Sequence, residues 1–295
     1  MADRKISYIP TLTVLDNYIK TYTGKGYQNE HDIAFGNPFF YGSLSDLEWI
    51  ASAHIPPHIK RLRANGAPPI IQRMDSMMAV NLQALNSGKV NIIAGTDAGN
   101  IGTMHASSYL QELQAMQRAG MSITDVIKSA TLNPASAFGR NTGLIEKGRE
   151  ADLVVLDSNP LESLENLTSV SYVFNNGIPI KADTLLKETP EMTVQRQLNA
   201  YNARSLEAFL DTYADDVELY NFPDKLMAKG KESLRTTYGD MFRNLNYLHC
   251  KIEKRIVLGN KIIDHERVKF NDQTVQAVAI YEVENGKIVR VTFLE

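Results

Sequence analysis

The sequence predicts two domains of different class, an α/β domain followed by an α+β domain. Strands alternate with amphipathic helices over residues 1–140, and short strands separated by turn residues occupy 141–183. Two long helical stretches then precede four alternating segments within residues 193–295. Alternating strands and helices are typical of parallel βα units, whereas helices followed by a set of strands are typical of an α+β domain. The polar, Pro-containing stretch 184–192 is predicted to be the linker between them.

The first domain is predicted to contain two buried strands and a series of helices. Apolar runs of strand length occupy residues 6–14 and 90–95. Residues 16–40 have no clear period and are predicted to form a loop with at most one helical turn. Helices are predicted from SLSDLEWIASA with a Ser cap, HIKRLRANG ending at Gly66, PIIQRMDSMMAVNLQALNSG ending at Gly88 and SSYLQELQAMQRAG ending at Gly120. SITDVIKSATLNPASAFG is predicted to form two short helices, the first capped by Ser122.

The rest of the chain is predicted to be richer in strands. NNG between SYVF and IPIK is a hairpin signal within residues 141–183. In the second domain, residues 193–219 form a long amphipathic helical region, at whose end Asp215 and Asp216 are expected to cap a turn. A second helix follows in KESLRTTYGDMFRN. Strands are predicted at 247–258, 260–270, 274–283 and 287–294.

Composition excludes several classes of function. A formal net charge of −3 gives no basic face for nucleic acid. No apolar run approaches the roughly 20 residues that a membrane span needs. The single cysteine, Cys250, excludes an intramolecular disulfide, and the N-terminus lacks a secretory pattern, so a cytoplasmic protein is expected. The opening MADRK is typical of the end of a helix leading into a strand, so either an internal Met is expected to have been taken as the start, or the beginning follows a gene split or frameshift.

An acidic residue stands at the end of the predicted second strand. In NIIAGTDAGN, the apolar run ends in Gly95 and Thr96, and Asp97 follows. Functional groups of parallel βα architectures lie where strands end and loops begin. A carboxylate there could ligate a divalent metal or exchange a proton with metal-bound water. Alternatively, Asp97 could simply cap the following turn.

The stretch from NIIAGTDAGN through AGMSITDVIKSATLNPA to ADLVVLD and NPL resembles the amidohydrolase superfamily, in particular its imidazolonepropionase-like and Xaa-Pro-dipeptidase-like members. The resemblance covers residues 5–183. It implies a metal-dependent (β/α)8 barrel, with strands seven and eight in 1–140 and the strands of a small β-sandwich in 141–183. It also implies hydrolysis of a carbon–nitrogen bond in a small amide, cyclic amide or dipeptide by water activated on a divalent metal, most commonly zinc. Asp97 would be metal ligand and proton shuttle, and His105 either a substrate-side group or a surface residue at a helix start.

The chain departs from this family in its metal ligands. The family's other ligands are a His-x-His pair, a Lys or Glu, and two further His residues at strand ends, and none of these is present. The only histidines before the linker are His31, His54, His58 and His105. His54 and His58 have a helical metal-pair spacing, but two prolines lie between them. Catalytic zinc takes about three protein ligands, so this chain alone is expected to be an incomplete, inactive catalytic domain.

Residues 193–295 resemble the nuclear-transport-factor-2-like superfamily, in the region of its SnoaL-like cyclases and steroid isomerases. The resemblance rests on VQRQLNAYNARSLEAFLDTYADDVELYNFP, AKGKESLRTTYGDMF and AIYEVENGKIVRVTF. It implies a cone formed by helices and a curved sheet, with an apolar pocket for a small molecule and dimerisation through the sheet, so a homodimer is expected. The steroid isomerases' catalytic positions fall on Gln197, Asn221 and Ile280, none of which retains that chemistry.

Possible polar groups of this second pocket are Asn221, His249 and the run Asp264, His265 and Glu266. If 260–270 is a strand, His265 faces away from both acids, so only one set lines the pocket. Alternatively, these residues face solvent. Two other functions remain open: a non-catalytic small-molecule-binding or dimerisation module, and an isomerase or cyclase acting through His265 or Asp264. Bound metal would distinguish the hydrolase from both.

Overall fold

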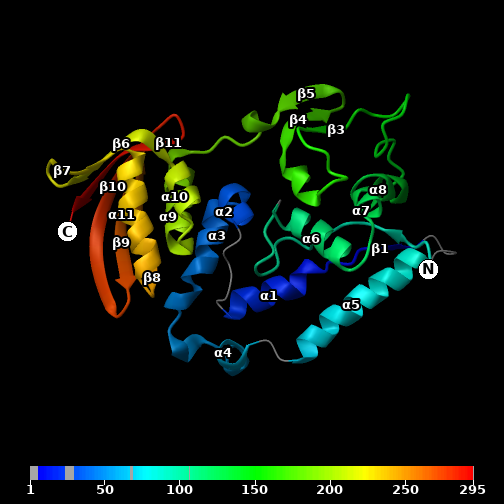
Figure 1. Ribbon diagram of the computed structural model, residues 1–295, viewed down its shortest axis with the longest axis horizontal. Helices are drawn as coiled ribbons and strands as arrows, with labels where there is room; N and C mark the ends of the chain where they lie inside the picture. The colour runs from blue at the N-terminus through cyan, green and yellow to red at the C-terminus, as the bar shows by residue number, and fades with distance from the viewer. Residues whose placement is uncertain (1–5, 24–29, 67–68, 106, 295) are drawn as a thin grey trace. The chain divides into compact units, whose positions relative to one another are not determined.

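The chain forms two compact units in the computed structural model (Figure 1). The structure describes residues 6–23, 30–66, 69–105 and 107–294. One unit comprises Met1–Lys25 and Ala53–Lys187, and the other comprises Gly26–Ser52 and Glu188–Glu295. This division differs from the expected one, because residues 26–52 group with the C-terminal unit although the sequence analysis assigned them to the first domain.

The first unit has a short parallel strand pair at its centre. Strand β1 (Ser7–Tyr8) pairs with β2 (Asn91–Ile92), and the Ile93 amide donates to the Tyr8 carbonyl over 2.9 Å. Both strands are shorter than predicted. The first ends early because Pro10 has no amide to donate and Thr11 adopts a φ of 48°, after which a helix begins.

Helices of the first unit, chiefly α5, α6 and α7, bury a core that includes Leu82, Ile92, Met116 and Val126. The helices of the first unit are α1 (Thr13–Thr23), α4 (Pro57–Asn65), α5 (Pro69–Ser87), α6 (Ser107–Arg118), α7 (Ile123–Ala130) and α8 (Leu132–Ala137), and its 3-10 turns are η3 (Ser52–His54), η4 (Leu164–Thr168) and η5 (Ala182–Thr184). The predicted Ser122 cap is confirmed, since its hydroxyl accepts from the Asp125 amide. No helix among the described residues is both long and apolar enough to cross a bilayer.

A three-stranded antiparallel sheet completes the first unit. Its strands are β3 (Leu153–Leu156), β4 (Val170–Asn175) and β5 (Ile178–Lys181). The predicted NNG hairpin is confirmed: Asn176 and Gly177, between β4 and β5, have φ values of 50° and 79°. Positive φ at both central residues is what a type I′ turn requires.

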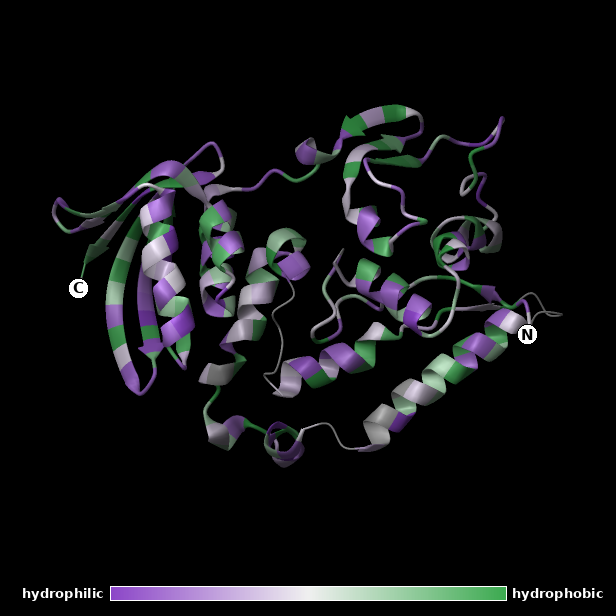
Figure 2. Ribbon diagram, in the orientation of Figure 1, coloured by the Kyte–Doolittle hydropathy of each residue, from purple (hydrophilic) through white to green (hydrophobic). Residues whose placement is uncertain are grey.

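The second unit is a curved sheet with helices on one face (Figure 1). Its strands are β6 (Tyr213–Asn221), β7 (Lys225–Lys229), β8 (Leu248–Leu258), β9 (Lys261–Phe270), β10 (Gln273–Glu284) and β11 (Lys287–Leu294). Their order is β7-β6-β11-β10-β9-β8, antiparallel except for the parallel β6–β11 pair. The helices are α9 (Pro190–Ala203), α10 (Leu206–Asp211) and α11 (Lys231–Asn244). Hydrophilic and hydrophobic residues alternate along the strands, as a sheet with one buried face requires (Figure 2).

The last helix and the last four strands were predicted correctly, but the start of the sheet was not. Asp215 and Asp216 lie within β6 rather than at the end of a helix. The helical region is interrupted by Arg204, whose φ is 55°, and α10 ends at Asp211. Strands β6 and β7 were missed altogether.

Residues 30–49, predicted to be mainly a loop and the start of a helix, form α2 (Glu30–Phe35), α3 (Pro38–Ser45) and a 3-10 turn η2 (Asp46–Trp49). Helix α9 holds them in place. Arg196 Nη1 donates to the Ile33 and Gly36 carbonyls over 2.9 and 3.0 Å. Asn199 Nδ2 donates to the Pro38 carbonyl over 2.7 Å. These bonds make the segment an integral part of the C-terminal unit.

Candidate functional site

Asp97 lies in a tight turn five residues after the end of β2. Its side chain is exposed, and its φ of 51° is the left-handed conformation that Asp tolerates better than most residues. Asn100 Nδ2 donates to Asp97 Oδ2 over 2.6 Å and to its carbonyl over 3.2 Å. The turn therefore presents the carboxylate outward, with one of its oxygens already hydrogen-bonded.

His105 belongs to the same loop and is also exposed. A Cβ built on Gly99 would lie 3.9 Å from His105 Nε2, so the imidazole lies beside a residue only two positions from Asp97. The loop therefore contains a carboxylate and an imidazole, the two candidates that the sequence singled out in the first unit.

The described residues do not fit a zinc centre. Nowhere among them do three or more His, Cys, Asp or Glu side chains gather closely enough to hold a metal ion. Asp97 shares its loop with one imidazole, that of His105, and one of its oxygens is bonded to Asn100. Catalytic zinc needs about three protein ligands, so the expected metal has at most part of a site in this portion of the chain.

Sequence reasoning missed a buried carboxylate in the first unit. Glu112 of α6 is fully buried, and its two oxygens accept from the Leu12 and Thr13 amides over 2.8 and 2.9 Å. Burial raises the pKa of Glu112, while these hydrogen bonds act in the opposite direction. The contact satisfies orphan amides at the start of α1, which is a structural role. The available signal was an acid in the buried stripe of an amphipathic helix.

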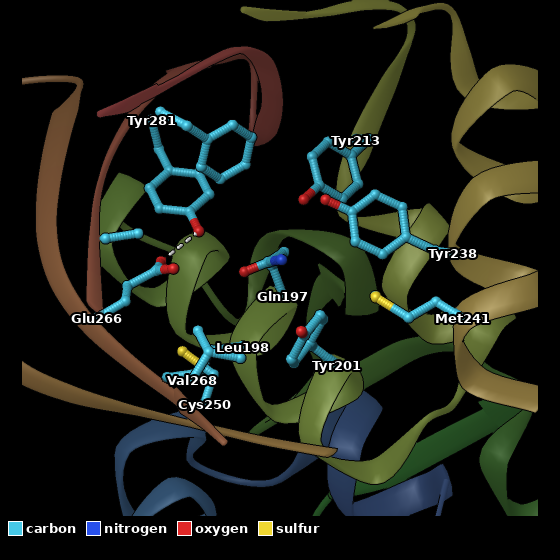
Figure 3. Close-up of a pocket in the computed structure, with 12 residues that line it drawn as sticks. Gln197, Leu198, Tyr201, Tyr213, Tyr238, Met241, Cys250, Glu266, Val268 and Tyr281 are labelled. Carbon is cyan, nitrogen blue, oxygen red and sulfur yellow. Dashed lines mark hydrogen bonds between the residues drawn. The ribbon is translucent and has the colours of Figure 1, made fainter. Parts of the chain in front are cut away.

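The C-terminal unit encloses a cavity of about 190 Å³ between its helices and the inner face of the sheet (Figure 3). Helices α9 and α11 contribute Gln197, Leu198, Tyr201, Tyr238 and Met241. The strands contribute Tyr213, Cys250, Glu266, Val268, Ala277, Tyr281 and Phe293. Glu266 is paired in register with Ala277 on β10, and this small neighbour leaves room in front of the carboxyl group.

Glu266 and Tyr281 form a hydrogen-bonded pair in this cavity. The Tyr281 hydroxyl donates to Glu266 Oε1 over 2.8 Å, and Glu266 is only 7% exposed. The pKa of Glu266 is raised to about 7, because burial, with a smaller contribution from nearby Asp264, outweighs the opposite effects of the Tyr281 hydrogen bond and of Arg255. The carboxyl group therefore exists in both protonation states near neutral pH.

The neighbouring acid, Asp264, is occupied by a buried ion pair. Arg255 Nε and Nη2 donate to its two oxygens over 2.7 and 2.6 Å, and Arg255 Nη1 donates to Gln195 over 2.9 Å. Such a bidentate pair leaves little of the guanidinium charge for Glu266. Burial and the nearby carboxyls raise the pKa of Cys250 well above its usual value, so this thiol stays protonated.

The other predicted residues lie apart from the cavity or on different faces. His265 is half-buried and its Nε2 lies 2.9 Å from Gln276 Oε1, whereas its neighbours in sequence, Asp264 and Glu266, are buried. His249 Nε2 lies 3.1 Å from Asp46 Oδ1. Neither histidine is among the residues that line the cavity.

Of the three positions aligned with the steroid isomerases, only Gln197 lines the cavity. Asn221, at the end of β6, does not line it, although its Oδ1 is buried without a hydrogen-bond partner. Ile280 faces away, because alternation places the adjacent Tyr281 on the inner face. The sequence analysis therefore missed the tyrosines of the cavity, and above all the Tyr281 partner of Glu266.

Comparisons with known proteins agree with this two-part organisation. Residues 51–181 match the model described as "Amidohydrolase family", and residues 194–291 match the model described as "SnoaL-like domain". The chain thus joins an amidohydrolase-type domain to a SnoaL-like α+β domain with a curved sheet, and both predicted resemblances are confirmed. Members of the first family are generally metal-dependent.

Among curated proteins, the chain is 34% identical over 110 residues to an ochratoxinase of Aspergillus niger, which covers 35% of this chain and 22% of the relative. It is 22% identical over 159 residues to a 5-methylthioadenosine/S-adenosylhomocysteine deaminase of Carboxydothermus hydrogenoformans, covering 54% of this chain and 35% of the relative. The chain therefore spans well under half the length of these relatives.

Two solved structures are each similar to part of the chain. A Xaa-Pro dipeptidase with bound methionine is 20% identical, with a TM-score of 0.40, and the match covers 62% of this chain and 36% of that chain. An NTF2-like protein from Cytophaga hutchinsonii is 18% identical, with a TM-score of 0.32, and the match covers 37% of this chain and 92% of that chain.

Proposed function

We propose that this chain is part of a hydrolase of carbon–nitrogen bonds in small molecules. The observation that carries the proposal is the amidohydrolase match over residues 51–181, which includes the turn that presents Asp97. The matched relatives include deaminases, whose name denotes removal of an amino group. In this proposal Asp97 belongs to the reaction centre and His105, on the same loop, contacts the substrate.

The proposal treats the 295 residues as an incomplete catalytic domain. Because the described residues provide no zinc site, it assigns this chain alone no metal-dependent step. The C-terminal unit serves as a small-molecule-binding or dimerisation domain joined through residues 184–192, which lie between the two matched segments. Homodimerisation would be detected as a doubled mass in analytical ultracentrifugation.

The experiment compares two proteins: the 295-residue chain and the longest reading frame in the coding DNA that contains it. Zinc content after dialysis and release of ammonia or amine from a panel of amides, cyclic amides and aminopurines are measured on both. We expect the 295-residue chain to retain less than one zinc per molecule and to hydrolyse none of these substrates. We expect the longer product to retain zinc and to hydrolyse at least one of them.

The variants Asp97→Asn and His105→Asn test the two residues in the longer product. Asp97→Asn should lower kcat/KM by about 100-fold or more, the usual weight of a positioned proton-transfer group. His105→Asn should act mainly on KM. Glu150→Gln, an exposed carboxylate-to-amide change elsewhere in the same unit, is the matched control and should change neither. Hydrolysis that survives Asp97→Asn, or a reading frame that adds no residues to an inactive chain, would refute the proposal.

A further inference from the structure

The cavity of the C-terminal unit combines aromatic walls with one uncompensated acid. Among the described residues that line it are four tyrosines, Phe293 and one carboxyl group, that of Glu266. None of the twelve described residues that line it is Lys, Arg or His. The Glu266 carboxyl group can therefore become negatively charged, and none of these lining side chains can carry a positive charge to balance it.

The surroundings of Glu266 do not provide the missing cation. On its own strand, Asp264 is a second acid, and Arg255 on β8 donates to both oxygens of that acid through the Nε–Nη2 edge of its guanidinium, while its Nη1 donates to Gln195. Cys250 on β8 remains a neutral thiol. The groups facing Glu266 from β10, and those lining the cavity from α9, α11 and β6, are hydroxyls, an amide and apolar side chains. Burying an unpaired carboxylate costs free energy. A positively charged ligand would form an ion pair with Glu266 and would lower this cost.

The hydrogen-bonding groups of the cavity suit a donor-rich ligand. Tyr281 uses Glu266 Oε1, which leaves Oε2 as an acceptor. Figure 3 shows the hydroxyls of Tyr213 and Tyr238 directed into the space between them and the pair formed by Glu266 and Tyr281, with Gln197 beside it. An ammonium group has N–H donors and no acceptor, and it matches a carboxylate surrounded by hydroxyl and amide oxygens. Aromatic rings also attract cations through their faces.

The size of the cavity limits the rest of the ligand. A cavity of roughly 150 Å³ lined by apolar side chains is sufficient for benzene, and this one measures about 190 Å³. Leu198, Met241 and Val268 provide apolar surface for a single ring. This volume therefore accommodates about one ring with a short substituent.

We propose that this cavity binds a small arylalkylamine in its protonated form, with the ammonium group on Glu266 and the ring against the apolar wall. The inference does not depend on the proposed hydrolase function. It is chemically compatible with it, since cleavage of a carbon–nitrogen bond releases an amine. The competing occupant is a neutral molecule of the same shape, which would accept a hydrogen bond from protonated Glu266 instead.

The experiment titrates the full chain with benzylamine and with benzyl alcohol, its neutral match, by calorimetry at pH 6 and pH 8. We expect benzylamine to bind more tightly than benzyl alcohol, with the difference growing at pH 8, where Glu266 is mostly ionised. Glu266→Gln should weaken benzylamine about 10- to 100-fold, the weight of a charge-assisted hydrogen bond, and leave benzyl alcohol nearly unchanged. Glu284→Gln, an exposed acid at the end of β10, is the matched control.

Three results would overturn the inference: benzyl alcohol binding as tightly as benzylamine, benzylamine binding that Glu266→Gln does not weaken, or no saturable binding of benzylamine or of the longer phenethylamine. A urea transition followed by Trp49 fluorescence shows that each variant is folded, because Trp49 contacts His249 and Arg267 within the C-terminal unit. Tyr281→Phe keeps Glu266 and the cavity, so benzylamine should still bind within a few-fold of wild type. Loss of binding in this variant would also count against Glu266 as the ammonium partner.

Discussion

Replacing Glu266 by Gln should make the C-terminal unit more stable at alkaline pH. In the variant, the amide oxygen of Gln can accept the hydrogen bond that Glu266 Oε1 accepts from Tyr281. The variant side chain cannot ionise. Because burial raises the pKa of Glu266 from 4.5 to about 7, the folded wild-type unit binds this proton more tightly than the unfolded chain does. Its contribution to stability is therefore complete below pH 4.5 and is lost as the pH rises to about 7.

The size of the effect follows from these two pKa values. One pKa unit corresponds to 1.36 kcal/mol, so ionising Glu266 costs the folded state about 3 kcal/mol once the pH is above 7. The side chain is only 7% exposed, so solvent screening reduces this value little. We expect Glu266→Gln and wild type to have similar free energies of unfolding near pH 4.5, with the variant more stable by up to about 3 kcal/mol at pH 8.

The assay is urea unfolding followed by fluorescence at a series of pH values. The chain has a single tryptophan, Trp49, and it lies in the C-terminal unit. The centroids of the Trp49 and His249 rings are 5.9 Å apart. Its fluorescence therefore reports on the unit that contains Glu266. A difference between variant and wild type that is the same at pH 5 and pH 8 would refute the reasoning, because a change in packing alone does not depend on pH.

Three further predictions concern packing. Glu112→Gln should destabilise the first unit by about 1–3 kcal/mol, because an amide leaves one buried N–H at the start of α1 unsatisfied; hydrogen exchange at these amides would rise, and unchanged protection would contradict the assigned role. Gly42→Ala should lower the urea midpoint of the C-terminal unit, because an added Cβ would lie 2.5 Å from Gln195 Nε2; exposed Ser43→Ala is the control, and equal midpoints for the two variants would disprove the close contact. The fragment 188–295 should unfold at lower urea than the same unit in the full chain, because α9 loses the carbonyl partners of its polar side chains; circular dichroism would detect this, and identical transitions would show that the N-terminal segment adds nothing.

Elements with a strong local signal were predictable from the sequence. The helices α4 to α7 have clear stops or caps, such as Gly66 and Ser122, and α11 coincides with its predicted range. The last four strands have apolar residues at alternate positions between obvious turns. In each case the physical determinant lies within about ten residues of the element itself.

Helix α1 was missed because its buried face is polar. Thr13, Asn17 and Thr21 recur every four residues and are buried, so a search for apolar periodicity finds nothing. Their burial depends on partners far along the chain: Asn17 Nδ2 lies 3.4 Å from both Thr103 and Gln111. These hydrogen bonds of Asn17 span 86 and 94 residues, so no local sequence pattern indicates them.

Strand β6 was missed because its spacing is ambiguous. Tyr213 and Val217 are buried four residues apart, which continues the helical spacing of Phe209 and Leu210 before them. The same two residues are also compatible with the period of a strand, in which every second residue is buried. The pairing of β6 with β11 decides between the two, and that partner lies some 70 residues downstream.

The two candidate sites, the Asp97 turn and the cavity with Glu266 and Tyr281, also differ in whether a local sequence pattern indicates them. Asp97 was found because its position after an apolar run is visible within ten residues. The pair formed by Glu266 and Tyr281 spans two strands and depends on their register, and a shift of one residue moves every side chain to the other face. The sequence analysis considered Ile280 but not the adjacent Tyr281, which is the residue that lines the cavity.

The stability of the C-terminal unit and the proposed ligand depend on the same buried carboxyl group. A cavity optimised for stability alone would place Gln or an apolar residue where Glu266 lies, since ionisation there costs the folded state. An ammonium ligand would remove that cost, so benzylamine should raise the urea midpoint of wild type more at pH 8 than at pH 5 and should stabilise Glu266→Gln little at either pH. If Glu266→Gln abolishes the pH dependence while benzylamine stabilises neither protein, the buried carboxyl is established and the amine site is excluded. The two ideas can therefore fail separately, although both depend on one side chain.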